Sequence, residues 1–301
     1  MTEASIADRG PGPHFFCIGP AKSATTWIAD HLKLHRDVWL PPIQEVSYLA
    51  GEFHIYRDSE HLELRWDWWN LAKRVVRNKS LSTRRDRLFY AVARELAAMP
   101  PGTVDLDGYR RLFAPADGRL TGDISPVYAR LDAERIRHAA PVLDGRPIFA
   151  IARDPVERFW SAMSMYYRYR TFGEVDYGSL ETAQRLFHDP VRSPQHFLTA
   201  ILDRWQGVLG EGRVKLFFFD DIAERPEATF RDIVAFIGGD YGQRLPFVRP
   251  GYNRQGGTDK AAIAPAARAW VREAFRPELE AGAARFGRHG RRWLERHGSP
   301  A

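Results

Sequence analysis

The feature that most constrains the fold is a short apolar run leading directly into a loop of small and hydroxyl residues. Residues 14–19 are apolar and end at Gly19-Pro20, which predicts a buried strand. Residues 23–34 place apolar side chains at helical spacing without a helix breaker, which predicts a helix. A buried strand followed at once by a helix is typical of a βαβ unit in a parallel sheet.

The rest of the chain repeats this alternation. Further strands are predicted at 38–40, 119–124, 147–152 and 214–219, and further helices at 58–98, 154–170 and 227–237. Strands separated by helices predict an α/β fold with a central, mostly parallel sheet flanked by helices. We expect a single domain over residues 14–301, with a disordered tail at 1–13 and a helical, aromatic-rich insertion at about 58–115.

Composition limits the class of protein. The 301 residues carry 44 Lys and Arg against 38 Asp and Glu, a formal net charge of +6, and 44% are hydrophobic, which predicts a globular chain. The single cysteine, Cys17, excludes a disulfide framework and a cysteine-based zinc site. The net charge is too dilute for a nucleic-acid binder.

Targeting signals are absent from the pattern of the chain. No apolar run approaches the ~20 residues of a membrane span, and the N-terminus lacks the basic-then-apolar order of a secretory signal. We therefore expect a cytoplasmic protein with no membrane or nucleic-acid partner, and leave a homodimer open. Arginines far outnumber the six lysines. This bias suits phosphate and sulfate recognition, but a GC-rich bacterial genome gives the same bias without functional meaning.

The loop after the first predicted strand is suited to binding an anion. The first amide N–H groups of a helix have no partner within the helix, and the helix dipole is positive there. Lys22 adds a full charge, and Ser23, Thr25 and Thr26 add hydroxyl donors, whereas capping the helix requires only one such residue. The nucleoside-triphosphate loop Gly-x-x-x-x-Gly-Lys-Ser/Thr does not match, because Lys22 follows Gly19 by three residues.

A second motif follows the fourth predicted strand. Asp154 and Pro155 have the residue types of a helix N-cap and first turn, and Glu157 fits a capping box. Arg153 lies at the carboxyl end of the strand, the edge where open α/β sheets bind ligands. Ser161 follows eight residues later, about two helical turns up, where its hydroxyl can share a ligand with Arg153. Pairing of Arg153 with an acidic neighbour, and a merely surface-exposed Ser161, are the open alternatives.

Together the two motifs resemble those of the sulfotransferases that use 3′-phosphoadenosine 5′-phosphosulfate (PAPS) as donor. Residues 20–27 are similar to the family's 5′-phosphosulfate loop, and residues 153–161 to its 3′-phosphate motif. Further pieces match in the same order at 44–48, 122–128 and 212–239. The resemblance covers most of the chain and implies a P-loop-like sulfotransferase fold, PAPS as co-substrate with 3′-phosphoadenosine 5′-phosphate (PAP) as product, and no required metal.

The resemblance also implies roles for individual residues. Lys22 is expected to stabilise the leaving 5′-phosphate, and Arg153 and Ser161 to bind the 3′-phosphate. Trp27 is expected to stack on the adenine, with ordinary core packing as the alternative. The remaining donor contacts implied by the resemblance are Ser23, Ala24, Thr25 and Thr26 for the 5′-phosphate, and, from a weaker match near 249–260, Arg254, Gly256, Gly257 and Lys260.

The catalytic base implied by the resemblance is Glu45, which matches the glutamate of the carbohydrate-sulfating branch. The alternative is a glutamate that only favours a helix N-terminus through the dipole, and His54 is a reserve candidate for the base. Gln44, Ser47 and Ile124 stand where that branch carries lysine, histidine and lysine, which argues against a strongly anionic polysaccharide acceptor.

The sequence thus predicts sulfuryl transfer from PAPS to a hydroxyl of a small molecule or saccharide. Two alternatives stay open. One is a nucleotide-dependent kinase that uses the same anion-binding loop, and the other is a non-catalytic nucleotide-binding protein of this fold.

Overall fold

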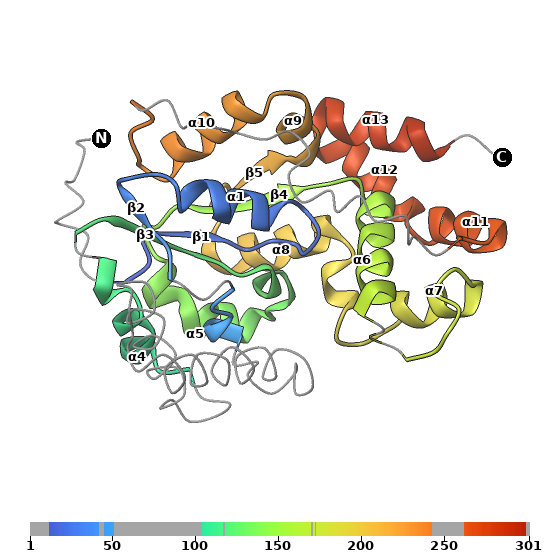
Figure 1. Ribbon diagram of the computed structural model, residues 1–301, viewed down its shortest axis with the longest axis horizontal. Coiled ribbons are helices and arrows are strands. Elements are labelled where there is room, and N and C mark those ends of the chain that lie inside the picture. The colour runs from blue at the N-terminus through green and yellow to red at the C-terminus, as the bar shows by residue number, and fades with distance from the viewer. Residues whose placement is uncertain are drawn as a thin grey trace, which may run out of the picture.

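A five-stranded parallel sheet forms the centre of the protein (Figure 1). The computed structural model describes residues 12–41, 45–50, 104–116, 118–169, 171, 173–242 and 262–298. The strands are β1 (Phe15–Cys17), β2 (Val38–Trp39), β3 (Leu120–Ile124), β4 (Ile148–Ala152) and β5 (Val214–Phe218). Their order is β2-β3-β1-β4-β5, and every neighbouring pair is parallel. The predicted fold class is confirmed, and each strand lies within a predicted range.

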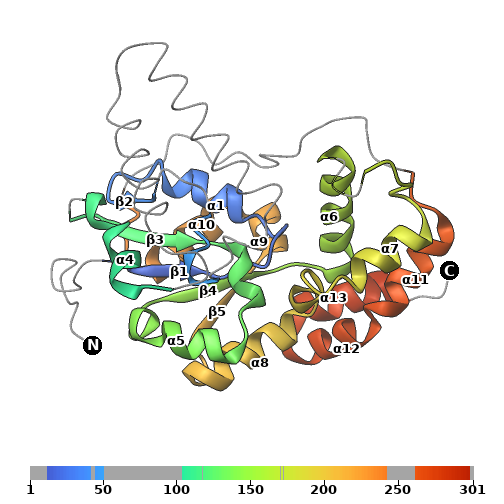
Figure 2. The ribbon, with the colours of Figure 1, turned by 90° about the horizontal axis from the view of Figure 1, so that it is seen from below.

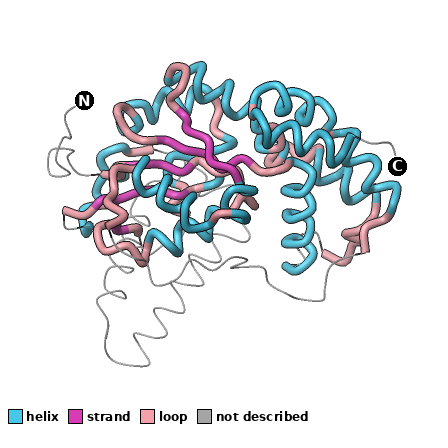
Figure 3. Tube along the Cα trace, turned by 90° about the horizontal axis from the view of Figure 1, so that it is seen from above, coloured by secondary structure: helices cyan, strands magenta, loops and turns pink. Residues whose placement is uncertain are grey.

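Helices cover both faces of this sheet, as Figure 2 and Figure 3 show from opposite sides. One face carries α1 (Thr25–Leu32) and α10 (Pro226–Phe236), and the other carries α5 (Ala133–Leu143) and α8 (Leu198–Leu209). Both faces are apolar because the side chains of a strand alternate between them. Phe15 and Cys17 accordingly belong to the core under α1 and α10, and Phe16 belongs to the core under α5 and α8.

The remaining described helices flank this layered body. They are α4 (Leu106–Arg111), α6 (Pro155–Tyr169), α7 (Leu180–Phe187), α9 (Phe219–Glu224), α11 (Pro265–Ala274), α12 (Arg276–Arg285) and α13 (Gly287–Gly298). The predicted helices at 23–34, 154–170 and 227–237 are confirmed as α1, α6 and α10. The predicted helix at 58–98 lies outside the described residues, as do most of the insertion and of the tail. No helix in the described ranges has the length and apolar character needed to cross a membrane.

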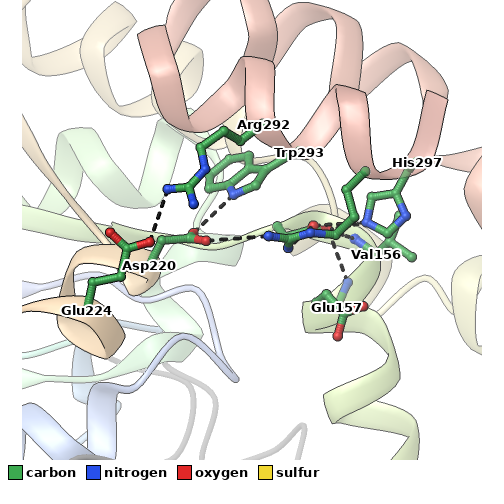
Figure 4. A network of polar contacts seen from close by, with 9 residues as sticks. Val156, Glu157, Asp220, Glu224, Arg292, Trp293 and His297 are labelled. Atoms are coloured by element: carbon green, nitrogen blue, oxygen red, sulfur yellow. Dashed lines mark hydrogen bonds and ion pairs between the residues drawn. The ribbon is translucent and has the colours of Figure 1, made fainter. Parts of the chain in front are cut away.

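The C-terminal helix α13 is attached to the carboxyl ends of β4 and β5 by polar contacts (Figure 4). Asp154 caps α6 as predicted, because its carboxylate accepts hydrogen bonds from the amides of Val156 (3.1 Å) and Glu157 (3.2 Å). The same carboxylate pairs with Arg296 and His297 of α13, each at 2.9 Å. One buried side chain therefore fixes both the start of α6 and the position of α13.

Candidate functional site

The loop between β1 and α1 turns sharply at the carboxyl end of β1. Gly19 has φ +91°, and a Cβ at this position would approach Cα of Pro126 to 2.7 Å, so only glycine fits. The Gly19 carbonyl accepts a hydrogen bond from the amide of Ile151 (2.9 Å), which fastens the loop to β4. Lys22 and Ala24 follow with φ 67° and 68°, a left-handed backbone that is unfavourable for residues with a side chain.

This strained path leaves the N-terminus of α1 without a side-chain cap. The N-cap residue is Ala24, no side chain caps the helix, and the first turn contains no acidic residue. Ser23 is 0% exposed, and its hydroxyl has no hydrogen-bond partner within the described part of the chain. Helix capping by the hydroxyl residues, the alternative considered from the sequence, is therefore not what the loop shows. Its uncapped amides, a buried hydroxyl and a lysine suit an anion.

The two sequence motifs meet at Lys22. Nη1 of Arg153 donates a hydrogen bond to the Lys22 carbonyl (2.5 Å), across 131 residues of sequence, and its guanidinium lies 4.2 Å from the ring centroid of Phe219. Nζ of Lys22 lies 3.7 Å from Sδ of Met165. Burial lowers the pKa of Lys22, and the positive charges of Arg153 and Arg168 lower it further. At the Lys22 ammonium, the charges of Arg153 and Arg168 thus outweigh the opposite charge of Glu45.

Two other predicted donor contacts lie on the helices that follow the two motifs, Trp27 on α1 and Ser161 on α6. Ser161 is partly exposed on α6, two turns beyond Arg153. Trp27 is only 5% exposed, with its ring centroid 4.4 Å from that of His31 and 5.9 Å from that of Phe230. The core packing of Trp27, considered as the alternative, is present in the structure, and stacking on an adenine stays a prediction.

Glu45 shares a solvent-open hollow with the first turn of α1. The hollow is lined by Thr25, Thr26, Ala29, Lys33, Leu40, Pro41, Glu45, Val46, Gly122, Asp123 and Ile124. Glu45 is also close enough to Lys22 to raise its pKa, although less than burial lowers it. The structure thus brings the predicted base to the hydroxyl residues of the anion-binding loop.

A second hollow lies on the α6 side of Lys22, which lines it. Its residues Arg158, Arg192, Gln195 and His196 were not identified from the sequence. Arg158 and His196 are buried in its wall, and Arg192 completes it. Nη2 of Arg158 donates to the carbonyls of Gln195 (2.8 Å) and His196 (3.0 Å). Burial lowers the pKa of Arg158 to about 10 and that of His196 to about 3.

Five predicted site residues lie outside the described residues, namely His54, Arg254, Gly256, Gly257 and Lys260. Their predicted roles stay predictions. Within the described ranges no group of three or more His, Cys, Asp or Glu side chains is arranged to hold a metal ion.

Comparison with known proteins identifies the fold. No protein-family model matches the sequence, and no curated protein matches it. Among solved structures, the chain is similar to a sulfotransferase from Alicyclobacillus acidocaldarius, with a TM-score of 0.59 and 21% identity over 90% of this chain and 94% of that one. It is also similar to the sulfotransferase domain from the curacin biosynthetic pathway, with a TM-score of 0.50 and 16% identity over 97% and 99% of the two chains. The chain therefore has the sulfotransferase fold that its motifs predict.

Proposed function

We propose that this chain is a PAPS-dependent sulfotransferase that transfers a sulfuryl group to a hydroxyl of a small molecule or saccharide. The observation that carries the proposal is the meeting of Lys22 and Arg153 beside the uncapped N-terminus of α1. In a sulfotransferase fold, this arrangement supplies two separate positive contacts, which suits a donor that carries phosphate groups at both its 5′ and 3′ positions.

Binding of the donor follows from the charges at this point. The α1 amides, the Ser23 hydroxyl and Lys22 bind the 5′-phosphosulfate, while Arg153 and Ser161 bind the 3′-phosphate. Burial is the main cause of the lowered pKa of Lys22, and repulsion from Arg153 and Arg168 lowers it further. A bound phosphate offsets this repulsion through charge-assisted hydrogen bonds, which favours donor binding at this point.

The transfer itself needs a base on the acceptor and positive charge on the leaving group. The acceptor oxygen forms a bond to sulfur as the bond between sulfur and the 5′-phosphate oxygen breaks, and PAP leaves. Glu45 accepts the acceptor proton, and Lys22 with the α1 amides stabilises the negative charge that develops on the leaving oxygen. The hollow that Glu45 shares with Thr25 and Thr26 supports this division of roles.

Transfer of ³⁵S from labelled PAPS tests the proposal. The purified chain is incubated with a phenol, a primary alcohol and a saccharide, with and without EDTA, and PAP affinity is measured by calorimetry. We expect label in at least one acceptor, in equal amount with the chelator present. Tight PAP binding without transfer favours a non-catalytic nucleotide-binding protein. Transfer of ³²P from ATP that EDTA abolishes, with none from PAPS, favours a kinase.

A further inference from the structure

A buried hydrogen-bond network lies behind the segment that carries Glu45. Asp123, near the carboxyl end of β3, is fully buried and also contributes to the wall of the Glu45 hollow. Its carboxylate accepts hydrogen bonds from the hydroxyls of Ser125 (2.5 Å), Tyr128 (2.6 Å) and Tyr109 (2.7 Å). Burial raises the pKa of Asp123, and these three donors oppose that rise. Three donors on one buried carboxylate fix the direction of each hydroxyl.

Two of these hydroxyls also accept hydrogen bonds from backbone amides of the segment that follows Glu45. Because Ser125 and Tyr128 each donate their proton to Asp123, their oxygens are free to accept from elsewhere. Oγ of Ser125 accepts from the amide of Ser47 (2.9 Å), and the Tyr128 hydroxyl accepts from the amide of Leu49 (3.3 Å). Asp123 therefore determines which way both acceptors face.

The segment needs such support because its backbone is strained. Glu45 has φ 60° and Ser47 has φ 57°, and neither is glycine. Residues in this left-handed region stay there only when the surroundings hold them. Oγ of Ser47 donates to the carbonyl of Glu45 (3.3 Å), which links the two strained residues to each other. The hydroxyl of Ser125 accepts its hydrogen bond from the amide of Ser47, the second of these strained residues.

We propose that Asp123, acting through Ser125 and Tyr128, positions Glu45 for proton transfer from the acceptor. The three are positioning residues, because none of their contacts described above is with a reacting group. The inference rests on the proposed function, since it assigns Glu45 the role of base. It adds that the geometry of this base is set by a buried carboxylate on a different strand.

Ser125→Ala tests the proposal, because it removes the acceptor for the Ser47 amide. We expect kcat to fall about 10- to 100-fold, as a displacement near 1 Å typically costs, while KM for PAPS stays within about two-fold. Ser125→Thr keeps the hydroxyl and should restore most of the loss. Tyr109→Phe is the matched control, since Asp123 loses the same kind of donor but no hydrogen bond to residues 45–50. Its kcat should stay within about two-fold of the wild type.

A double-mutant cycle shows whether the effect passes through Glu45. In a Glu45→Gln background, Ser125→Ala should cause little further loss of kcat, because residues that act as a unit are not additive. An undiminished second loss contradicts the proposal, as does a wild-type kcat for Ser125→Ala. If Ser125→Ala does not fold, Tyr128→Phe removes the acceptor for the Leu49 amide and provides the same readouts.

Amide hydrogen exchange separates this inference from the proposed function. Exchange at Ser47 should accelerate at least ten-fold in Ser125→Ala and stay unchanged in Tyr109→Phe, whether or not an acceptor is known. Unchanged exchange in Ser125→Ala refutes the positioning network even in an active enzyme. Accelerated exchange in a protein that transfers no sulfuryl group with any acceptor refutes the proposed function and leaves the network in place.

Discussion

At the scale of single residues, the donor site depends on where two cations lie. Arg153 is bound to the loop by its contact with the Lys22 carbonyl, so its guanidinium is held beside the place where we propose that a phosphate binds. A guanidinium can hydrogen-bond a phosphate through two N–H groups, and such charge-assisted bonds contribute about 1.5–3 kcal/mol. In the proposed function, Arg153 is thus the residue that would distinguish a donor with a 3′-phosphate from one without.

Arg153→Ala should weaken PAP binding about 10- to 100-fold while changing the affinity for adenosine 5′-phosphosulfate much less, because only PAP carries a 3′-phosphate. Isothermal titration calorimetry with both ligands measures this difference. Arg137→Ala, at an exposed arginine of α5, is the control and should leave both affinities unchanged. Equal losses for the two ligands in Arg153→Ala would place the 3′-phosphate elsewhere.

Glu45→Gln should lower kcat about 10²–10⁴-fold, the usual contribution of a general base. The amide has almost the same shape as the carboxylate, so the affinity for PAP, measured by calorimetry, should be nearly intact. The acceptor is the best substrate found among the phenol, alcohol and saccharide. Near-normal turnover in this variant would transfer the role of base to His54 or to another residue.

The residue scale also shows what the sequence leaves undetermined. The sequence predicts Lys22 because it lies among hydroxyl residues just before a helix N-terminus. It predicts Arg153 because this residue lies at the carboxyl end of an apolar strand. Arg158 was not predicted as part of a hollow, because helix start signals already accounted for its segment. Its burial depends on the carbonyls of Gln195 and His196, which lie 37 and 38 residues away and leave no local pattern.

At the scale of elements, local patterns predict strands and helices but not their neighbours. The strands β1 and β4 are recognisable because they are continuously apolar, as buried parallel strands are. The order β2-β3-β1-β4-β5 depends on packing between distant segments, and no local signal contains it. The contact between α13 and the start of α6 is of the same kind. It joins Asp154 to Arg296 and His297, which follow it in the sequence by 142 and 143 positions.

Two substitutions of Asp154 separate its role as a helix cap from its role in fixing α13. Asp154→Ser keeps a good N-cap for α6 but loses the bonds to Arg296 and His297, whereas Asp154→Ala loses both. We expect both variants to be less stable than the wild type, and the alanine variant to be less stable than the serine variant by about 1 kcal/mol. Urea unfolding measures both differences. Equal stability of the two variants means that the cap contributes nothing.

At the scale of the whole molecule, burial and neighbouring charge together determine how the stability of the fold depends on pH. His196 lines the second hollow and stacks on Phe187, with 5.1 Å between the two ring centroids. Its buried ring nitrogens have no hydrogen-bond partner in the described residues. Burial and the nearby charge of Arg158 lower its pKa from 6.5 to about 3. In the unfolded chain the same imidazole regains a proton as the pH falls below 6.5. The folded state therefore loses stability in the window between these two pKa values.

His196→Phe should remove this part of the acid sensitivity, because a phenyl ring fits a stacked, unbonded position and takes up no proton. Between pH 8 and pH 5, the wild type should lose about 2 kcal/mol of unfolding free energy that the variant keeps, since each pH unit below 6.5 costs about 1.4 kcal/mol. Urea unfolding at both pH values measures the difference. His138→Gln, at an exposed histidine, controls for a general effect of losing a histidine and should behave as the wild type. An equal loss of stability in the wild type and in His196→Phe would mean that His196 is protonated in the folded protein. The charge of Asp189, which raises the pKa of His196, would then outweigh the effects of burial and of Arg158.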